Sequence, residues 1–287
     1  MSAKILRRIS VLLVIGMTVL FIPRLFAPMP ESGVAGLQSG DRCESGSSGK
    51  HGRETFISPQ GLGISVVTPS DYNNRHRYGL LMMFPPAGFS GKAAERFYEI
   101  TEESTAAGYV VAFSDSIPLS ANAIRLQANV ITEVIKRWCI DANRIVLAGH
   151  SDGGLMAQAV TLRRTAKDPN PVSVLASAAG IREEDLVSEA CPEPRSVTIL
   201  HTEFDERFPG YGSGVARWWA RCFGCQQMSE HAGLYQCVDA AGCRERGAVH
   251  YCATKEPHNQ QPKQFRSELF QILKRQKNTH STFQDEK

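Results

Sequence analysis

A glycine-flanked serine between an apolar strand and a helix constrains this chain more than any other feature. Residues 144–159 read Arg-Ile-Val-Leu-Ala-Gly-His-Ser-Asp-Gly-Gly-Leu-Met-Ala-Gln-Ala. The order strand, sharp turn, helix is typical of a nucleophile elbow with Ser151 at its tip. Gly149 and Gly153 fit this interpretation because a side chain two positions from Ser151 would clash across the turn. We therefore predict that Ser151 is a nucleophile; the alternative is a Gly/Ser turn without chemistry.

Apolar runs and helical patterns alternate along most of the chain. The expected strands cover residues 63–69, 80–84, 109–113, 145–148, 172–176, 197–200 and 248–252. The expected helices cover residues 93–107, 128–138 and 263–274, with one more after Ser151. Strands that are buried on both faces read as continuous apolar runs, so the alternation predicts an α/β fold. We expect a mostly parallel sheet with helices on both faces and a cysteine-rich insertion before the last strand.

The N-terminal segment carries basic side chains ahead of a short apolar run. Lys4, Arg7 and Arg8 precede residues 9–22, an apolar stretch of 14 residues. A membrane span needs about 20 apolar residues, so this stretch fits the core of a signal peptide better. We predict a signal peptide over residues 1–27, with an uncleaved membrane anchor as the alternative. The protein is then expected in the periplasm or outside the cell.

The rest of the chain divides into a linker, one domain and a tail. Residues 28–54 are rich in Gly, Ser and Pro and are expected to form a flexible linker. Residues 55–275 carry the strand and helix pattern of the predicted α/β domain, and residues 276–287 form a polar tail. Four basic and no acidic residues among the first 27 account for the net charge of +3, which leaves −1 on the remainder. Without a basic patch, we expect no nucleic-acid partner.

Most of the eight cysteines lie in the C-terminal half of the chain, and five of them fall within 31 residues. Cys222 and Cys225 are spaced as in many zinc sites, which is one interpretation. Behind an export segment, disulfides are favoured over zinc because the compartment is oxidising. The spacing by itself leaves the connectivity open.

A nucleophilic serine needs a base, which we expect to be a histidine on a loop after a strand. His258 lies between the last expected strand and the last expected helix, where it would reach back over the elbow. A surface-loop histidine without chemistry is the alternative. The remaining histidines after the serine are less well placed; they are His201, His231, His250 and His280.

The base in turn needs a carboxylate, which in such a sheet comes between the serine and the histidine in the sequence. Asp205 follows the expected strand 197–200 after a few residues and is the predicted acid. Glu203 and Glu206 are neighbouring rivals, and a solvated acidic loop is the alternative for all three.

Four pieces of sequence, in the right order and spacing, resemble one family. They are Val-Thr-Pro-Ser-Asp-Tyr at 67–72, Ile-Asp-Ala-Asn-Arg at 140–144 ahead of Gly-His-Ser-Asp-Gly-Gly, Leu-His-Thr at 200–202 with Asp205 and Pro209, and Gly-Cys at 242–243 followed by Gly-Ala-Val and His258. Over about residues 55–275 the chain resembles secreted polyhydroxybutyrate depolymerase, feruloyl esterase and acetyl xylan esterase-like enzymes of the α/β-hydrolase fold. The resemblance implies that Asp205 is the acid and His258 the base.

Two departures from that family bear on activity. The family usually has Leu-His-Gly-x-Gly after an early strand, where a backbone N–H helps to hold the oxyanion. Here residues 84–88 read Phe-Pro-Pro-Ala-Gly, and proline has no N–H, so only Ala87 can take that role, beside the N–H of Asp152. The family also often has Gly-His-x-Trp-Pro at the base, whereas residues 257–260 read Pro-His-Asn-Gln, which bears on substrate preference.

The resemblance also implies part of the cysteine pairing. The family has one cysteine ahead of the insertion and another just before the final strand. The pairs expected on this basis are Cys225 with Cys243 and then Cys222 with Cys237. Cys252 is left free in its strand or joined to a distant cysteine such as Cys191.

Together these patterns predict an exported serine esterase that hydrolyses polyester, cell-wall or aromatic esters through an acyl-enzyme, without a metal or other cofactor. A serine peptidase on the same fold and a non-catalytic binding protein are the alternatives. The replaced oxyanion loop motivates the binding protein, and the Ser/Asp/His set argues against it. The aromatic residues near the insertion either line an acyl or sugar site or pack the insertion onto the sheet; they are Trp218, Trp219, Phe223 and Tyr235.

Overall fold

The computed structural model describes residues 43, 48–164, 169–202, 204–226, 228 and 236–284. The predicted signal peptide and most of the predicted linker lie outside these residues. The described strands are β1 (Arg53–Ile57), β2 (Gly63–Val67), β3 (Tyr78–Phe84), β4 (Tyr109–Ser114), β5 (Ile140–His150), β6 (Ser173–Ser177), β7 (Ser196–Thr202), β8 (Cys237–Asp239) and β9 (Ala248–Thr254). The described helices are α3 (Gly91–Tyr98), α4 (Thr101–Ala106), α5 (Ala121–Arg137), α6 (Asp152–Arg163), α7 (Tyr211–Cys222) and α8 (Gln264–Gln284).

The described strands form one sheet in the order β1-β2-β4-β3-β5-β6-β7-β9-β8. The six adjacent strands β4-β3-β5-β6-β7-β9 run parallel. Antiparallel pairs occur only toward the two edges, at β1–β2, β2–β4 and β9–β8. The predicted mostly parallel sheet is therefore confirmed. The carboxyl ends of the parallel strands lie at one edge of the sheet, so the loops after β3, β5, β7 and β9 gather there.

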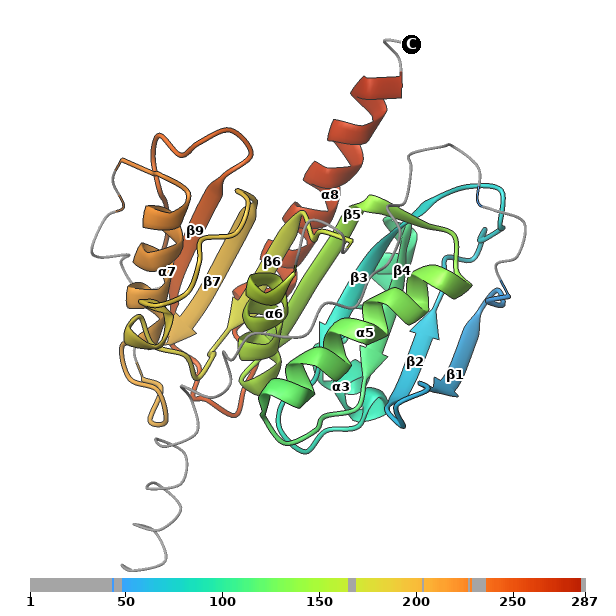
Figure 1. Cartoon of the computed structure of the whole chain (residues 1–287), viewed down its shortest axis with the longest axis horizontal. Coiled ribbons are helices and arrows are strands. Elements are labelled where there is room, and N and C mark those ends of the chain that lie inside the picture. Colours follow the sequence, from blue (N-terminus) through green and yellow to red (C-terminus); the bar gives the residue numbers. More distant parts are fainter. Residues whose placement is uncertain are drawn as a thin grey trace, which may run out of the picture.

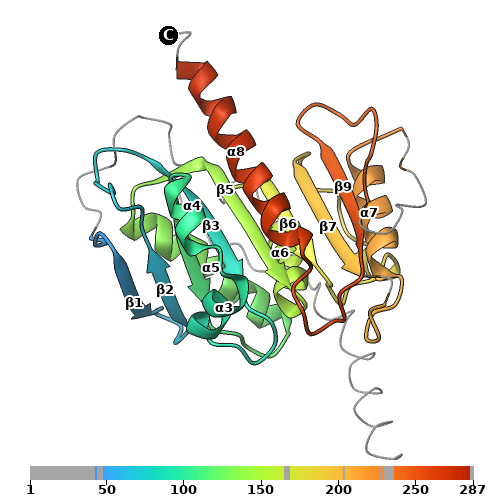
Figure 2. The same ribbon diagram turned by 180° about the vertical axis from the view of Figure 1, so that it is seen from behind.

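Helices cover both faces of the sheet, as predicted. Helices α5, α6 and α7 lie on the face that is toward the viewer in Figure 1, and α3, α4 and α8 lie on the face shown in Figure 2. Strand β3 shows why the apolar run is continuous: Leu80 and Met82 pack in the first core, and Leu81 and Met83 pack in the second. Because side chains alternate between the faces, a strand between two helical layers must be apolar at every position.

Several element boundaries differ from the predictions; among them, α5 begins at Ala121 rather than at residue 128, and β5 covers Ile140–His150 rather than residues 145–148. The expected helix over residues 93–107 is two helices, since Glu99 adopts a left-handed conformation with φ of 50° between α3 and α4. Helix α7 was not predicted, because its opening Tyr-Gly-Ser-Gly reads as a turn. Helix α8 continues to Gln284 rather than ending at residue 274.

All eight cysteines are described, and none is free. The four disulfides are Cys43–Cys139, Cys191–Cys222, Cys225–Cys243 and Cys237–Cys252. The predicted pair Cys225–Cys243 is confirmed, and the predicted pair Cys222–Cys237 is wrong. Cys237 lies directly opposite Cys252 in the β8–β9 ladder, so strand register decides its partner. Four disulfides are typical of proteins from an oxidising, exported compartment.

The first disulfide anchors part of the segment that was predicted to be a flexible linker. Cys43 is bonded to Cys139, and the Gly49 N–H donates to the Arg137 carbonyl over 2.8 Å. Strand β1 then begins at Arg53, before the expected start of order near residue 55. Within the described part of the chain, no helix is both long and apolar enough to cross a membrane.

Candidate active site

Ser151 occupies the sharp turn between β5 and α6, as the sequence predicts. Its backbone has φ of 57° and ψ of −123°, a conformation that residues other than glycine rarely adopt. The Ser151 N–H donates to the carbonyl of Ser177 at the end of β6 over 2.8 Å, which helps to hold the strained turn. Such strain is concentrated at functional sites, where surrounding packing maintains it.

The glycines around Ser151 are required by close backbone approaches. A Cβ on Gly149 would lie 2.3 Å from the carbonyl carbon of Gly153 across the turn. A Cβ on Gly153 would lie 2.2 Å from the Phe84 carbonyl oxygen, at the end of the neighbouring strand β3. Both contacts are far inside van der Waals distance, so only glycine fits. The elbow therefore packs directly against the loop that follows β3.

The three predicted triad residues lie side by side. The hydroxyl oxygen of Ser151 is 2.8 Å from Nε2 of His258, and Nδ1 of His258 is 2.8 Å from Oδ2 of Asp205. The residues come from separate loops at the carboxyl edge of the sheet, after β5, β7 and β9. All three are buried, with 8%, 4% and 2% of Ser151, His258 and Asp205 exposed.

Hydrogen bonds keep the Asp205 carboxylate ionised. Burial alone would raise its pKa, but the bond from His258 and the N–H groups of Phe208 and Arg207 outweigh that effect. The two backbone bonds reach Oδ1 over 2.8 and 2.9 Å, which leaves Oδ2 for the histidine. The pKa of Asp205 therefore lies below its ordinary value. An ionised carboxylate only accepts hydrogen bonds, so His258 carries its proton on Nδ1 and its Nε2 accepts from the Ser151 hydroxyl.

The rival acids and histidines that the structure describes are not part of the Ser151–His258–Asp205 chain of contacts. Glu206 has an exposed side chain, and Glu203 lies outside the described residues. His201 is buried beside the acid loop, where its Nε2–H donates to the Phe208 carbonyl over 2.8 Å. His231 is likewise outside the described residues, and nothing is described of the His280 side chain.

The backbone N–H groups of Asp152 and Ala87 are the candidates for an oxyanion hole. Asp152 is the first residue of α6, and Ala87 lies in a turn that the Phe89 N–H closes by donating to the Pro86 carbonyl over 3.2 Å. Gly88 has φ of 77° in this turn. Neither the Asp152 nor the Ala87 N–H donates to another group among the described residues. The loop therefore keeps one N–H donor, that of Ala87, although Pro85 and Pro86 have none.

Three buried polar residues that were not predicted as site residues lie next to the triad. Tyr98, Ser177 and the neighbouring His150 are buried and hydrogen-bonded to one another or to the triad's main chain. Ser177 ends β6, the parallel strand next to β5. Its position at the carboxyl edge of the sheet was the sequence signal that could have identified it as a residue near the site.

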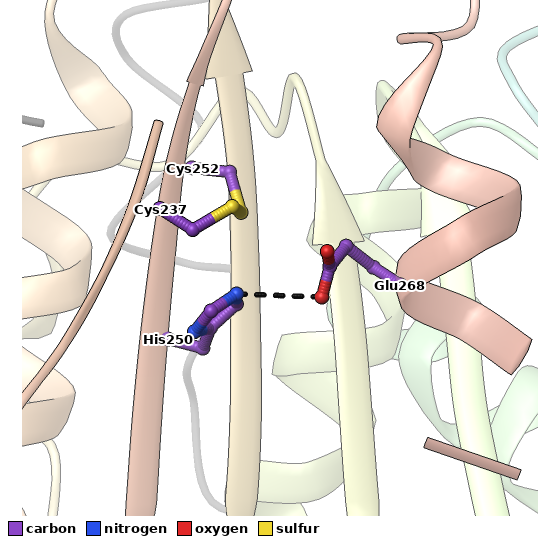
Figure 3. Close-up of side chains that lie close together, drawn as sticks. All are labelled: Cys237, His250, Cys252 and Glu268. Atoms are coloured by element: carbon purple, nitrogen blue, oxygen red, sulfur yellow. Dashed lines mark ion pairs between the residues drawn. A yellow bond between two sulfur atoms is a disulfide. The ribbon is translucent and has the colours of Figure 1, made fainter. Parts of the chain in front are cut away.

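A second cluster, shown in Figure 3, brings together the side chains of Cys237, His250, Cys252 and Glu268. The two sulfurs are bonded to each other, whereas a metal would need free thiolates. His250 instead bridges two carboxylates, with Nε2 3.3 Å from Glu268 and Nδ1 2.6 Å from Asp239. Its pKa is raised, chiefly by Glu268. This cluster therefore joins β8, β9 and α8 rather than forming an open ligand set.

The aromatic residues near the insertion pack in the core. Trp218, Trp219 and Phe223 are buried on and just after α7, and the Trp219 indole N–H donates to Gln158 over 2.9 Å. Tyr235 lies outside the described residues. Phe208 instead contacts His258, with its ring centroid 5.1 Å from that of the imidazole in an edge-on arrangement.

Comparisons with known proteins agree with this architecture. No family model and no curated protein matches the chain. An acetyl xylan esterase from Aspergillus awamori has a similar structure, with a TM-score of 0.56 and 13% identity over 72% of this chain and 93% of the other. An S-formylglutathione hydrolase from Staphylococcus aureus gives 0.55 and 10% over 78% and 97%. An esterase from Thermogutta terrifontis gives 0.52 and 13% over 81% and 94%. The chain therefore has the α/β-hydrolase fold of these esterases and hydrolases.

Proposed function

We propose that this protein is an exported serine hydrolase that cleaves carboxylic esters through the side chains of Ser151, His258 and Asp205. The observation that carries the proposal is the pair of 2.8 Å contacts that link these side chains in the order nucleophile, base, acid. This arrangement activates a serine hydroxyl that would otherwise be a weak nucleophile. The α/β-hydrolase fold, which the solved esterases share, supports it.

In the proposed mechanism, the Ser151 oxygen attacks the ester carbonyl carbon while its proton passes to Nε2 of His258. The resulting imidazolium lies against the ionised Asp205, which stabilises its charge. The same proton then passes to the departing alcohol, which leaves an acyl group on Ser151. His258 next takes a proton from water while the water oxygen attacks the acyl carbon. The bond between the acyl carbon and the Ser151 oxygen then breaks, Nε2 of His258 returns the proton to that oxygen, and the acid is released.

The tetrahedral intermediates carry negative charge on the former carbonyl oxygen. We propose that the N–H groups of Ala87 and Asp152 bind this oxygen, aided by the positive end of α6. Each such donor typically contributes about 3 kcal/mol to transition-state stabilisation. The free state of both N–H groups, described above, supports this role. No cofactor is required for any step.

We further propose that residues 1–27 direct export and that the substrate is a polyester, a cell-wall ester or an aromatic ester. The four disulfides support export, and the resemblance to depolymerases and feruloyl or acetyl xylan esterases supports the substrate classes. A serine peptidase would use the same side chains. Hydrolysis of ester but not peptide analogues of the same acyl group would separate the two.

The test is hydrolysis of p-nitrophenyl acetate by the purified protein, alongside Ser151→Ala, Asp205→Asn and His258→Ala. We expect each variant to lose at least about a thousandfold in kcat while its melting temperature stays near that of the wild type. Glu206→Gln is the matched control for the acid and should keep wild-type activity. Full activity in Asp205→Asn, or loss in Glu206→Gln, would show that the acid is misassigned. A wild type that is folded but inactive on every ester would favour the binding-protein alternative.

A further inference from the structure

His150, which precedes the proposed nucleophile, is buried and hydrogen-bonded through three groups. Only 2% of the residue is exposed. Its backbone N–H donates to the hydroxyl of Tyr98 over 2.8 Å. Its Nδ1 lies 3.0 Å from the hydroxyl of Ser177, and its Nε2 lies 2.7 Å from the main-chain carbonyl oxygen of His258. The side chain next to the nucleophile thus contacts the backbone of the base.

The partners determine the tautomer of the His150 ring. A carbonyl oxygen only accepts hydrogen bonds, so Nε2 carries the proton and donates to His258. Nδ1 is then the acceptor, and the Ser177 hydroxyl donates to it. Burial lowers the pKa of His150 to about 4, so the ring holds a single proton at neutral pH, as this arrangement requires. The direction of each hydrogen bond is therefore set.

We propose that His150 is a positioning residue that holds the main chain of the catalytic base in register with the nucleophile. The inference rests on the proposed function, because it concerns the same triad. The loop carrying His258 is attached to the elbow twice: through Ser151 to the Nε2 of the base, and through His150 to its carbonyl. Two attachments on opposite parts of one residue restrict both the position and the tilt of the imidazole.

The same network extends to the proposed oxyanion loop. The Tyr98 hydroxyl accepts from the His150 N–H and donates to the Phe84 carbonyl over 2.8 Å. Phe84 ends β3 and leads directly into the loop that contains Ala87. Ser177 contributes twice, since its carbonyl also accepts from the Ser151 N–H. Nucleophile, base and oxyanion loop are thereby tied together by buried hydrogen bonds.

The burial of a polar ring at position 150 supports a role for its hydrogen bonds. An imidazole buried at the end of a core strand loses its hydration, and a leucine or phenylalanine would pack there without that cost. The groups that face the ring are the Ser177 hydroxyl, the His258 carbonyl, the aromatic ring of Phe97 and the imidazole of His258. The centroids of the two rings lie 5.5 and 5.7 Å from that of His150. The two hydrogen bonds are therefore what distinguishes histidine from an apolar residue here.

The test compares two replacements of His150. In His150→Phe the ring is kept and both hydrogen bonds are lost, so we expect kcat/KM for p-nitrophenyl acetate to fall roughly 10- to 100-fold, mainly through kcat. In His150→Gln the terminal amide can donate to the His258 carbonyl again, and the rate should return to within about fivefold of the wild type. Val134→Ala, a buried change on α5 away from the site, controls for loss of stability alone.

Labelling of Ser151 by a fluorophosphonate is the second readout, because it requires the activated serine but no ester turnover. The same order of rates is expected: wild type, then His150→Gln, then His150→Phe. If the wild type is labelled in this pattern but hydrolyses no ester, the proposed function fails and the positioning role stands. Wild-type labelling rates in His150→Phe, no recovery in His150→Gln, or an equal loss in Val134→Ala would overturn the positioning role. A wild type that is neither labelled nor active would overturn both.

Discussion

Replacing Gly153 by alanine tests how tightly the elbow is held. The new Cβ would lie 2.2 Å from the carbonyl oxygen of Phe84 and 3.0 Å from that of Pro85. Both atoms belong to backbone, so no side chain can move aside. Relief requires the elbow and the loop after β3 to separate by roughly 1 Å. That displacement would alter the distance between Ser151 and the proposed oxyanion donor at Ala87.

The expected energies separate activity from stability. Overpacking costs about 1–3 kcal/mol, and alanine in a helix regains about 1 kcal/mol over glycine, so Gly153→Ala should unfold at nearly the wild-type temperature or somewhat lower. A misplacement of 1 Å in an active site costs on the order of a hundredfold in rate, so kcat/KM should fall far more than stability does.

The matched control is Gly214→Ala, which also lies in the first turns of a helix. There the new Cβ would meet side chains rather than backbone, Glu183 at 3.0 Å and Arg217 at 3.7 Å, so activity should be unchanged and stability close to that of the wild type. Both variants are assayed on p-nitrophenyl acetate and by thermal unfolding. If Gly153→Ala kept kcat/KM within about threefold of the wild type, the steric account of the elbow would be wrong.

Three further predictions concern the oxyanion loop, acid stability and a disulfide. Ala87→Pro removes one N–H at a turn position that accepts proline, so kcat should fall about a hundredfold or more with an unchanged melting temperature, and Ala87→Gly should stay active. Below pH 6.5 the unfolded chain protonates His150 before the folded protein does, so stability should drop toward pH 4 by roughly 3 kcal/mol, and thermal melts of His150→Phe should show a flatter profile. Changing Cys237 and Cys252 to alanine should cost about 3 kcal/mol and loosen the strand that leads to His258, so activity should fall at temperatures at which circular dichroism still shows native structure.

The triad geometry could be anticipated because each member follows an apolar strand of a parallel sheet. Ser151, Asp205 and His258 come after β5, β7 and β9, and the carboxyl ends of such strands lie at one edge. Local sequence patterns were therefore enough to predict that three residues far apart in the sequence lie close together. The roles of these residues remain predictions until the variants are assayed.

The cysteine pairing could not be read in the same way. Cys237 pairs with Cys252 because β8 adds to the edge of the sheet in a particular register. Cys222 pairs with Cys191 because the end of α7 lies close to the segment that carries Cys191. Both depend on elements that carry weak local signals: β8 has three residues, and α7 opens with glycines. The network around His150 could not be predicted for a related reason, since a histidine next to the nucleophile in the sequence gives no sign of where its ring points.

The placement of the disulfides has a consequence for when the protein becomes active during its biosynthesis. Ser151 belongs to the part of the chain synthesised first, whereas the acid and base come with a later part that contains three of the four disulfides. A newly made chain in a reducing cytoplasm would carry the nucleophile without the cross-links that secure the strand leading to its base. On the proposed function, full activity would appear only after oxidation, and the producing cell's own esters would be protected while the chain is in the cytoplasm.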